Sequence, residues 1–151
     1  MAEERIQVRR RIAAPAARVW EIVSNPEGHV LIDGSGMLKG ALDARPLTAV
    51  GDTFDMDMDR EPLGDTPLGL YQVRNWVVRI EPGRVIEWSP NLLGTDAPYP
   101  HVWGWQIDPV SDAECDATNY NDWRDMPDDL KPHWPIVPLQ MIERSLGIEM
   151  G

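Results

Sequence analysis

The clearest regularity along this chain is an alternation of apolar and polar positions with a period of two residues. Residues 5–12, RIQVRRRI, alternate in this way, and residues 52–59, DTFDMDMD, do so most regularly. In the second segment Phe54, Met56 and Met58 fall on one face, and aspartates fall on the other. Because successive side chains of a strand point to opposite faces, both segments are predicted to be strands with one apolar face.

Five further segments have the composition of strands and are separated by turns or loops. Glu81-Pro82-Gly83 is a turn, and residues 109–113 form another short link. Strands at this spacing predict an antiparallel meander, in which each strand pairs with the next one along the chain. The five segments are residues 37–41, 70–81, 84–89, 101–108 and 114–123.

Two short helices are predicted between the first strand and the meander. Pro15 suits the start of a helix, and apolar residues follow at helical spacing over residues 16–23. Asn25-Pro26 ends this helix, because the residue before a proline disfavours the helical conformation. A second, shorter helical turn is expected over residues 28–32.

A last helix is expected over residues 138–145, with Gly147 as its stop signal. The apolar face of an antiparallel sheet must be covered, and this helix, which includes Met141, is the longest element available to cover it. Prolines shorten the helix, so the interior would be more open or would need a second copy of the chain, as in a homodimer, to close it. These prolines are Pro132, Pro135 and Pro138.

The order of elements is therefore β-α-α-β6-α, and the predicted fold class is α+β. About seven antiparallel strands would form a curved sheet around the C-terminal helix. A large curved sheet closed by one helix leaves more interior than its side chains fill, which predicts an internal apolar cavity. Two longer connections, residues 60–69 and 90–100, are rich in Pro and Gly and should lie at the same end of the sheet.

Length and charge narrow the class of protein. The 151 residues fit one domain, residues 1–151, and the 42% of hydrophobic residues are enough for a core. There are 25 Asp and Glu against 14 Lys and Arg, a formal net charge of −11. Such a surface repels phosphate backbones and anionic bilayers, so nucleic acid is not an expected partner.

The single cysteine, Cys115, excludes an internal disulfide framework and fits a reducing compartment. No apolar run approaches the roughly 20 residues that span a bilayer, and the first eleven residues lack the apolar region of a signal peptide. A cytoplasmic protein without integral membrane association is the expectation.

Seven tryptophans but one phenylalanine make the aromatic composition unusual. Trp combines a large apolar surface with an N–H donor, and Met adapts to irregular shapes, so both residue types suit the wall of a ligand pocket. A solid core of the same residues is the competing interpretation. The predicted wall consists of Phe54, Met56, Met58, Ile86, Trp88, Trp103 and Trp105.

Polar residues that would orient a ligand are fewer. Asn119 and Asn121 share a strand face with Trp123, so they point inward if Trp123 does. Buried amides must be hydrogen-bonded, and a pocket with few polar groups uses such amides to hold a ligand. The alternative is a solvated face near the strand end. Tyr71 and Asn75 are ambiguous in the same way, because residues 71–80 are apolar on both faces.

Catalytic candidates are sparse. His101, at a strand start, is the best candidate for a general base, although a surface histidine is the simpler interpretation. Tyr71 is a second candidate. Arg10, which falls on the apolar face of its strand, is either a pocket-facing cation or part of a strand end twisted into solvent. Cys115 has no basic neighbour in the sequence to lower its pKa, so a thiolate nucleophile is not supported.

No cofactor or metal is predicted. The sequence has neither a Gly-rich phosphate cradle nor an HExxH motif. The aspartates of residues 52–59 form one row down a strand, whereas hard cations are bound by converging oxygens from loops, so a solvated outer face is the preferred interpretation.

Four segments together resemble the SRPBCC superfamily. They are VRRRIAAPAARVWEIVSNPEGHVLIDGSG, IEPGRVIEW, HVWGWQIDP and TNYNDW. This superfamily has the helix-grip fold and includes START domains, the birch-pollen allergen family and proteins similar to polyketide cyclases and dehydrases. The chain most resembles the small bacterial proteins of that last group. The resemblance covers nearly the whole chain and implies a fold rather than an activity.

The resemblance also implies an entrance. Residues 60–69 and 90–100 correspond in position to the loops that gate ligand entry in the ligand-sensing plant members of the superfamily. Four leucines would give these loops apolar tips able to close over a hydrophobic ligand: Leu63, Leu68, Leu92 and Leu93.

Three functions are compatible with these features. The first is binding of a hydrophobic small molecule, such as a polyketide, lipid or isoprenoid. The second is a cyclase or dehydratase that uses the same cavity for general acid–base chemistry. The third is a structural or interaction module whose hollow is filled by its own tryptophans. The sequence favours binding over the other two.

Overall fold

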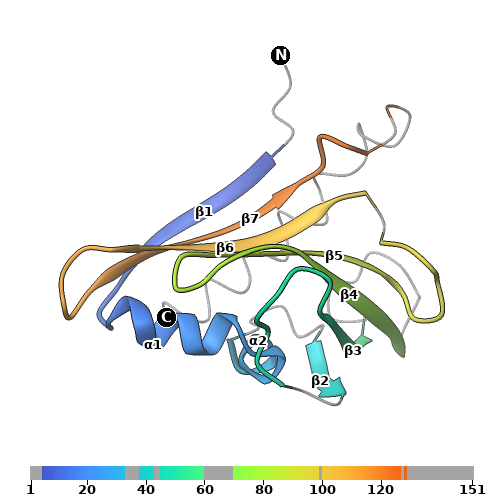
Figure 1. The fold of residues 1–151 in the computed structure, drawn as a ribbon, viewed down its shortest axis with the longest axis horizontal. Helices are drawn as coiled ribbons and strands as arrows, with labels where there is room; N and C mark the ends of the chain where they lie inside the picture. Colours follow the sequence, from blue (N-terminus) through green and yellow to red (C-terminus); the bar gives the residue numbers. More distant parts are fainter. Residues whose placement is uncertain are drawn as a thin grey trace.

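Seven antiparallel strands form one curved sheet, and two short helices pack on one side of it (Figure 1). The computed structural model describes residues 5–32, 38–42, 45–59, 70–98, 100–126 and 128. The elements are β1 (Arg5–Ile12), α1 (Ala16–Val23), α2 (Pro26–Ile32), β2 (Leu38–Leu42), β3 (Thr53–Asp59), β4 (Leu70–Glu81), β5 (Val85–Leu92), β6 (Val102–Pro109) and β7 (Cys115–Asp122).

The strand order in the sheet is β1-β7-β6-β5-β4-β3-β2. Strands β2 to β7 are the predicted meander, since each pairs with the next in sequence. The first strand is added at the far edge, where Ile6 lies opposite Asn121 and Ile12 opposite Cys115. This pairing joins residues more than one hundred positions apart, and alternation within a single strand could not have indicated it.

The predicted strands agree with the structure except at a few ends. The largest difference is in β5, which was predicted to end at Ser89 but continues through Pro90 to Leu92. Beyond Trp88, β5 pairs only with β4 and not with β6. Proline lacks an N–H donor, so it is tolerated where one side of the strand is unpaired. The second predicted loop therefore starts at Leu93 rather than at residue 90.

A bulge in β4 resolves the ambiguity of residues 71–80. Tyr71, Asn75 and Val77 lie on the same face as the apolar side chains of β3. The register with β5 then shifts between Val77 and Arg79. A strict alternation would place Arg79 on the same face as Val77. Because of the extra residue, Arg79 is exposed instead, and Ile80 lies opposite Ile86.

Asn25 lies between the two helices, and its side chain caps the N-terminus of the second. Its Oδ1 accepts a hydrogen bond of 3.0 Å from the backbone N–H of Glu27, and Pro26 occupies the first position of α2. The second helix thus begins two residues before the predicted residue 28. A Cβ atom at Gly28 would lie 1.9 Å from the carbonyl oxygen of Ile22, so only glycine permits this close approach of α2 to α1.

The sheet has an inner face, which carries the apolar side chains of β3 and faces α1 and α2, and an outer face. Val19 and Val23 of α1 are buried against the inner face in one continuous apolar cluster. The sheet residues of this cluster are Phe54, Met56, Met58, Val77, Ile86, Trp105, Ile107, Cys115 and Ala117.

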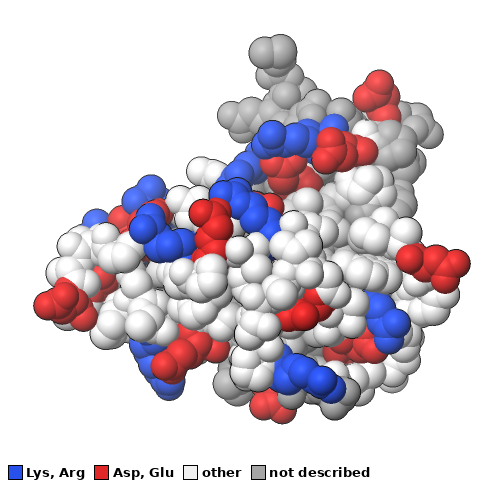
Figure 2. Space-filling model, in the orientation of Figure 1, with Lys and Arg blue, Asp and Glu red and all other residues white. Residues whose placement is uncertain are grey.

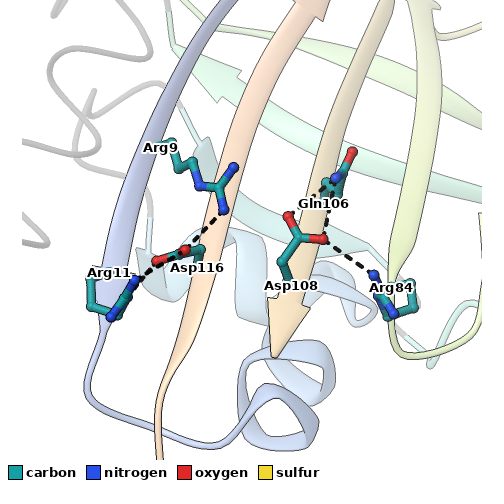
Figure 3. Close-up of polar contacts among 6 residues, drawn as sticks. All are labelled: Arg9, Arg11, Arg84, Gln106, Asp108 and Asp116. Carbon is teal, nitrogen blue, oxygen red and sulfur yellow. Dashed lines mark hydrogen bonds and ion pairs between the residues drawn. The ribbon is translucent and has the colours of Figure 1, made fainter. Parts of the chain in front are cut away.

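Ion pairs between neighbouring strands cover the outer face. Asp116 of β7 accepts hydrogen bonds from Arg11 at 2.6 Å and from Arg9 at 2.9 Å, both on β1 (Figure 3). These hydrogen bonds lower the pKa of Asp116, and the one from Arg11 contributes most. Arg84, in the turn before β5, pairs with Asp108 of β6 (Figure 3). Positive and negative side chains of described residues alternate over the side of the molecule drawn in Figure 2.

Asp55 and Asp57 of the predicted aspartate row lie on this outer face, and Asp52 lies in the turn before β3. Asp55 accepts two hydrogen bonds from Arg74, and Asp57 accepts one from Gln72. Asp52 accepts hydrogen bonds from the backbone N–H groups of residues 48 and 49, which lower its pKa. Within the described ranges, no three His, Cys, Asp or Glu side chains are grouped so as to hold a metal ion.

Several predicted features lie outside the described residues. They are the C-terminal helix over residues 138–145 with Met141, and the first loop, residues 60–69, with Leu63 and Leu68. The cover that this helix would give to the inner face therefore stays a prediction. No helix among the described residues is long and apolar enough to cross a bilayer.

Candidate ligand-binding face

The apolar wall predicted from the sequence comes together on the inner face. Trp88 of β5 lies opposite Trp103 of β6, and Ile86 lies opposite Trp105. Ile86 and Trp105 are buried, whereas Trp88 and Trp103 are only partly buried. Phe54, Met56 and Met58 are buried on the same face in β3, which is two strands from β5 and three from β6. Most side chains of the wall are therefore buried, whereas the indoles of Trp88 and Trp103 are only partly covered.

An aromatic group at one end of this wall includes a histidine that the sequence did not single out. The ring of His29, in α2, stacks on Trp88 at 4.8 Å between centroids and meets the ring of Phe54 edge-on at 5.4 Å. Its Nε2 lies 2.6 Å from the carbonyl oxygen of Val23. Burial lowers the pKa of His29 to about 4, so the imidazole is neutral near pH 7.

Gly28 permits this placement. The close approach of α2 to Ile22 brings His29 within hydrogen-bonding distance of the last residue of α1, Val23. A glycine inside a helical turn is unfavourable by about 1 kcal/mol relative to alanine, so its presence signals a packing requirement. That glycine, directly before a histidine, was the signal in the sequence that could have identified His29.

Two inner-face amides are held by the sheet itself. Asn119 of β7 lies opposite Trp105, and its Nδ2 donates to the carbonyl oxygen of Gly104 at 2.9 Å. Asn75 of β4 lies opposite Phe54, and its Nδ2 donates to the Phe54 carbonyl oxygen at 3.2 Å. Both side chains are nearly inaccessible to solvent. The structure thus places Asn119 on the predicted inner face and gives the ambiguous Asn75 the same orientation.

His101 and Asn121 form a second buried polar pair. Asn121 lies opposite Trp103, and its Nδ2 is 3.1 Å from Nδ1 of His101. The side chain of His101 is buried rather than at the surface, and desolvation lowers its pKa to about 3. His101 is therefore neutral near pH 7, and its Nδ1 accepts the hydrogen bond of the amide. Both residues make further interactions.

The remaining polar candidates lie at different depths. Arg10 is exposed, and its Nη1 donates to the backbone carbonyl of Arg9, so it does not form a buried pocket cation. Tyr71 is half-buried opposite Met58. Cys115 is buried, and its burial raises the pKa of the thiol, which argues against a thiolate nucleophile.

The second predicted entrance loop is apolar at its start. Leu92 and Leu93 are 52% and 38% exposed, which is high for leucine in a folded domain. They lie at the end of the sheet where β5 leaves β6, beyond the pair of Trp88 and Trp103. Their role as an entrance stays a prediction.

Two open hollows among the described residues border members of the groups above, Phe54 in one and His101 in the other. One, of about 490 Å³, lies beside the connection from β2 to β3 and is bordered by Leu47, Phe54 and Arg74, among others. The other, of about 260 Å³, is bordered by Arg5, Glu87 and His101, among others. Each has more charged or polar lining residues than the inner face, so neither suits an apolar ligand as well.

Known proteins share this architecture. The Zhui aromatase/cyclase from Streptomyces sp. R1128 superposes with a TM-score of 0.59 at 14% identity, covering 97% of this chain and 93% of that chain. A truncated norcoclaurine synthase from Thalictrum flavum superposes with a TM-score of 0.54 at 12% identity, covering 99% and 96%. The fold is of the SRPBCC type.

This finding confirms the predicted resemblance and the predicted fold class, a curved antiparallel sheet with few helices. At such low identities the SRPBCC likeness establishes the fold alone. No protein-family model matches the chain. The uncharacterized protein Rv0088 of Mycobacterium tuberculosis is 30% identical over 112 residues, which are 74% of this chain and 44% of that protein. The chain thus spans less than half the length of the curated relatives it matches.

Proposed function

We propose that the chain binds a hydrophobic small molecule, of polyketide, lipid or isoprenoid type, against the inner face of the sheet. The observation that carries the proposal is the pair Trp88 and Trp103, which lie side by side on adjacent strands and are only partly buried. Indoles carry a large apolar surface, so covering the exposed remainder of Trp88 and Trp103 is favourable. A planar apolar ligand would complete that cover.

The surroundings of the two indoles support binding. Met56 and Met58 are flexible apolar side chains buried on the same face, and Asn119 supplies a fixed polar group. Such a combination of apolar walls with few, well-placed polar groups is typical of small-molecule sites.

A cyclase or dehydratase is the second candidate. One structural neighbour is an aromatase/cyclase, and two neutral imidazoles, those of His29 and His101, lie at the inner face. General-base catalysis is most effective when the pKa of the base lies near the working pH. With pKa values of about 4 and about 3, both imidazoles are weak bases near pH 7, which favours binding over catalysis.

A neutral fluorescent probe, N-phenyl-1-naphthylamine, tests the binding proposal by titration against the full chain. We expect saturable enhancement of probe fluorescence, and at least a tenfold loss of affinity in Trp103→Leu, which removes one wall indole. Trp76→Leu is the matched control, because Trp76 lies on the same sheet but on the outer face, opposite Thr53 and Ser89. No saturable binding, or equal losses in both variants, would contradict the proposal.

Native mass spectrometry of the purified protein gives an independent test. A hydrophobic molecule that co-purifies with the native chain and is lost from Trp103→Leu supports binding. If turnover of a polyketide-like substrate is found, His101→Ala decides whether the enzyme hypothesis holds at this residue. Undiminished turnover in that variant would rule out His101 as the base.

A further inference from the structure

Three polar side chains of the inner face use their donor groups in the same way. Nδ2 of Asn75, Nδ2 of Asn119 and Nε2 of His29 each contact a backbone carbonyl oxygen. A carbonyl oxygen can only accept a hydrogen bond. The orientation of each amide and the tautomer of the imidazole are therefore fixed by the backbone and are not free choices.

Each of these groups consequently presents an acceptor. Both amides leave Oδ1 unused, and the neutral imidazole of His29 leaves the lone pair of Nδ1. No described residue donates a hydrogen bond to these three atoms. Among the described residues, the only fully buried side-chain polar atom without a partner is Nε of Arg5 on the outer face. The three acceptors are thus not sealed inside the core, although their side chains are only 4–7% exposed.

Compensating cations are lacking on the described part of this face. Arg10 is the one basic residue in register with the inner-face positions, and it is exposed at the sheet edge. The amide nitrogen of Asn121, another inner-face donor, already contacts His101. The other donors there are neutral as well: the Nε2–H of His101, the indole N–H groups and the Tyr71 hydroxyl. A carboxylate or phosphate would lose its hydration against this wall and meet three acceptors.

We propose that the ligand of the inner face is a neutral molecule with hydroxyl or N–H donors, such as a phenol or an alcohol, and not an anion. This inference rests on the proposed function and narrows the ligand class within it. A hydroxyl or N–H group of the ligand can donate a hydrogen bond to the acceptor of Asn119, Asn75 or His29. A purely apolar ligand would bury the same acceptor without a hydrogen bond. Burying an unpaired acceptor costs about 1–3 kcal/mol, enough to decide between ligands of equal apolar area.

Three naphthalenes of nearly equal apolar surface separate the alternatives. 2-Naphthol carries one donor, 2-methoxynaphthalene carries none, and 2-naphthoate is an anion near pH 7. Binding of each compound to the full chain is measured by quenching of tryptophan fluorescence. We expect 2-naphthol to bind at least tenfold more tightly than 2-methoxynaphthalene, and 2-naphthoate to bind most weakly. Equal affinity for the first two, or tightest binding of 2-naphthoate, overturns the donor preference while leaving apolar binding intact. If none of the three binds, the proposed function fails, and the donor preference fails with it.

Variants assign the preference to the acceptors. Asn119→Ala and Asn75→Ala should each lower the affinity ratio of 2-naphthol to 2-methoxynaphthalene, and His29→Phe should do so while keeping an aromatic ring beside Trp88. The ratio is the readout because a general loosening of the site weakens both ligands together. Gln72→Ala is the matched control, an exposed amide on the outer face of β4. An unchanged ratio in all three inner-face variants, each shown by circular dichroism to be folded, overturns the assignment.

Discussion

The two faces of the sheet contain polar side chains that are satisfied in different ways, and β7 shows both in one strand. All eight residues of β7 are buried. On its outer face Asp116 is matched by two arginines, and the hydroxyl of Tyr120 donates to Glu87 at 2.5 Å. On its inner face Asn119 contacts a backbone carbonyl with its donor and leaves its acceptor unmatched by any described residue.

The difference separates structural from recognition roles. An ion pair or a hydroxyl–carboxylate hydrogen bond on the outer face satisfies both partners within the protein, so it contributes to stability and leaves nothing for a ligand. A half-satisfied amide on an apolar wall is fixed in orientation but keeps one hydrogen bond available. Changes on the outer face should therefore alter stability alone, whereas changes on the inner face should alter ligand binding and the response to pH.

The largest effect is expected from acidification, and it tests the inner face. His29 and His101 have pKa values of about 4 and about 3, below the ordinary value of 6.5. Between pH 6.5 and pH 4 the unfolded chain binds more protons than the folded one, so the stability present above pH 6.5 is lost as the pH falls. The loss should be about 3 kcal/mol for each histidine by pH 4.

Urea unfolding at several pH values measures this loss. His101→Gln and His29→Gln should each flatten the curve of unfolding free energy against pH in this window. A wild-type curve that is flat from pH 7 to pH 4 would show that these imidazoles are not buried in neutral form.

A smaller effect is expected from Gly104→Ala, which tests packing on the outer face. A Cβ atom at residue 104 would lie 2.4 Å from the ring of Tyr120, which is stacked across the glycine in the neighbouring strand. The ring must move, and Tyr120 is buried, so we expect a loss of about 2–3 kcal/mol in unfolding free energy. Chemical denaturation measures the loss, and the naphthol affinity of the folded variant should fall less than in Asn119→Ala, because the carbonyl group of residue 104 that holds Asn119 is kept. A loss of binding larger than the loss of stability would mean that the two faces are coupled.

Tyr120→Phe should cost about 1 kcal/mol, because it removes one hydrogen bond to the Glu87 carboxylate and little packing. Arg79 remains near Glu87 and limits the penalty of leaving that carboxylate with one partner fewer. Thermal denaturation measures the change. A gain of stability would show that the hydroxyl contact is strained rather than stabilising.

The smallest effect is expected from Asp116→Asn. Arg9 and Arg11 are more than half exposed, so water and salt screen their attraction to Asp116. The melting temperature should fall by less than in Tyr120→Phe, and the difference from wild type should shrink in about 0.5 M salt. A loss that is large and insensitive to salt would place this outer-face pair in the class of buried ion pairs.

Particular residues show how far sequence reasoning reached on the fold. The alternation of residues 52–59 and the turn at Gly83 defined strands that the structure confirms, because period and turn chemistry are local properties. The end of β5 was missed, because whether Pro90 can stay in a strand depends on whether β6 pairs beside it. The bulge at Val77 was missed for the same reason, since it is a property of two paired strands.

The candidate site divides in a similar way. The shared face of the apolar wall residues follows from alternation along single strands, whereas the inward orientation of Asn119, which the sequence left open, comes from the pairing of β7 with β6. His29 was overlooked, because its importance depends on a helix packing over Trp88, and His101 was expected at the surface but is buried.

The sequence by itself determined which segments are strands and which side chains share a face, because the backbone repeats every two residues whatever its partners are. Only the tertiary structure decided that β1 pairs with β7 at the edge of the sheet, and which half of each buried amide is used. These last features depend on pairings between residues distant in the chain, and no local pattern records a distant partner.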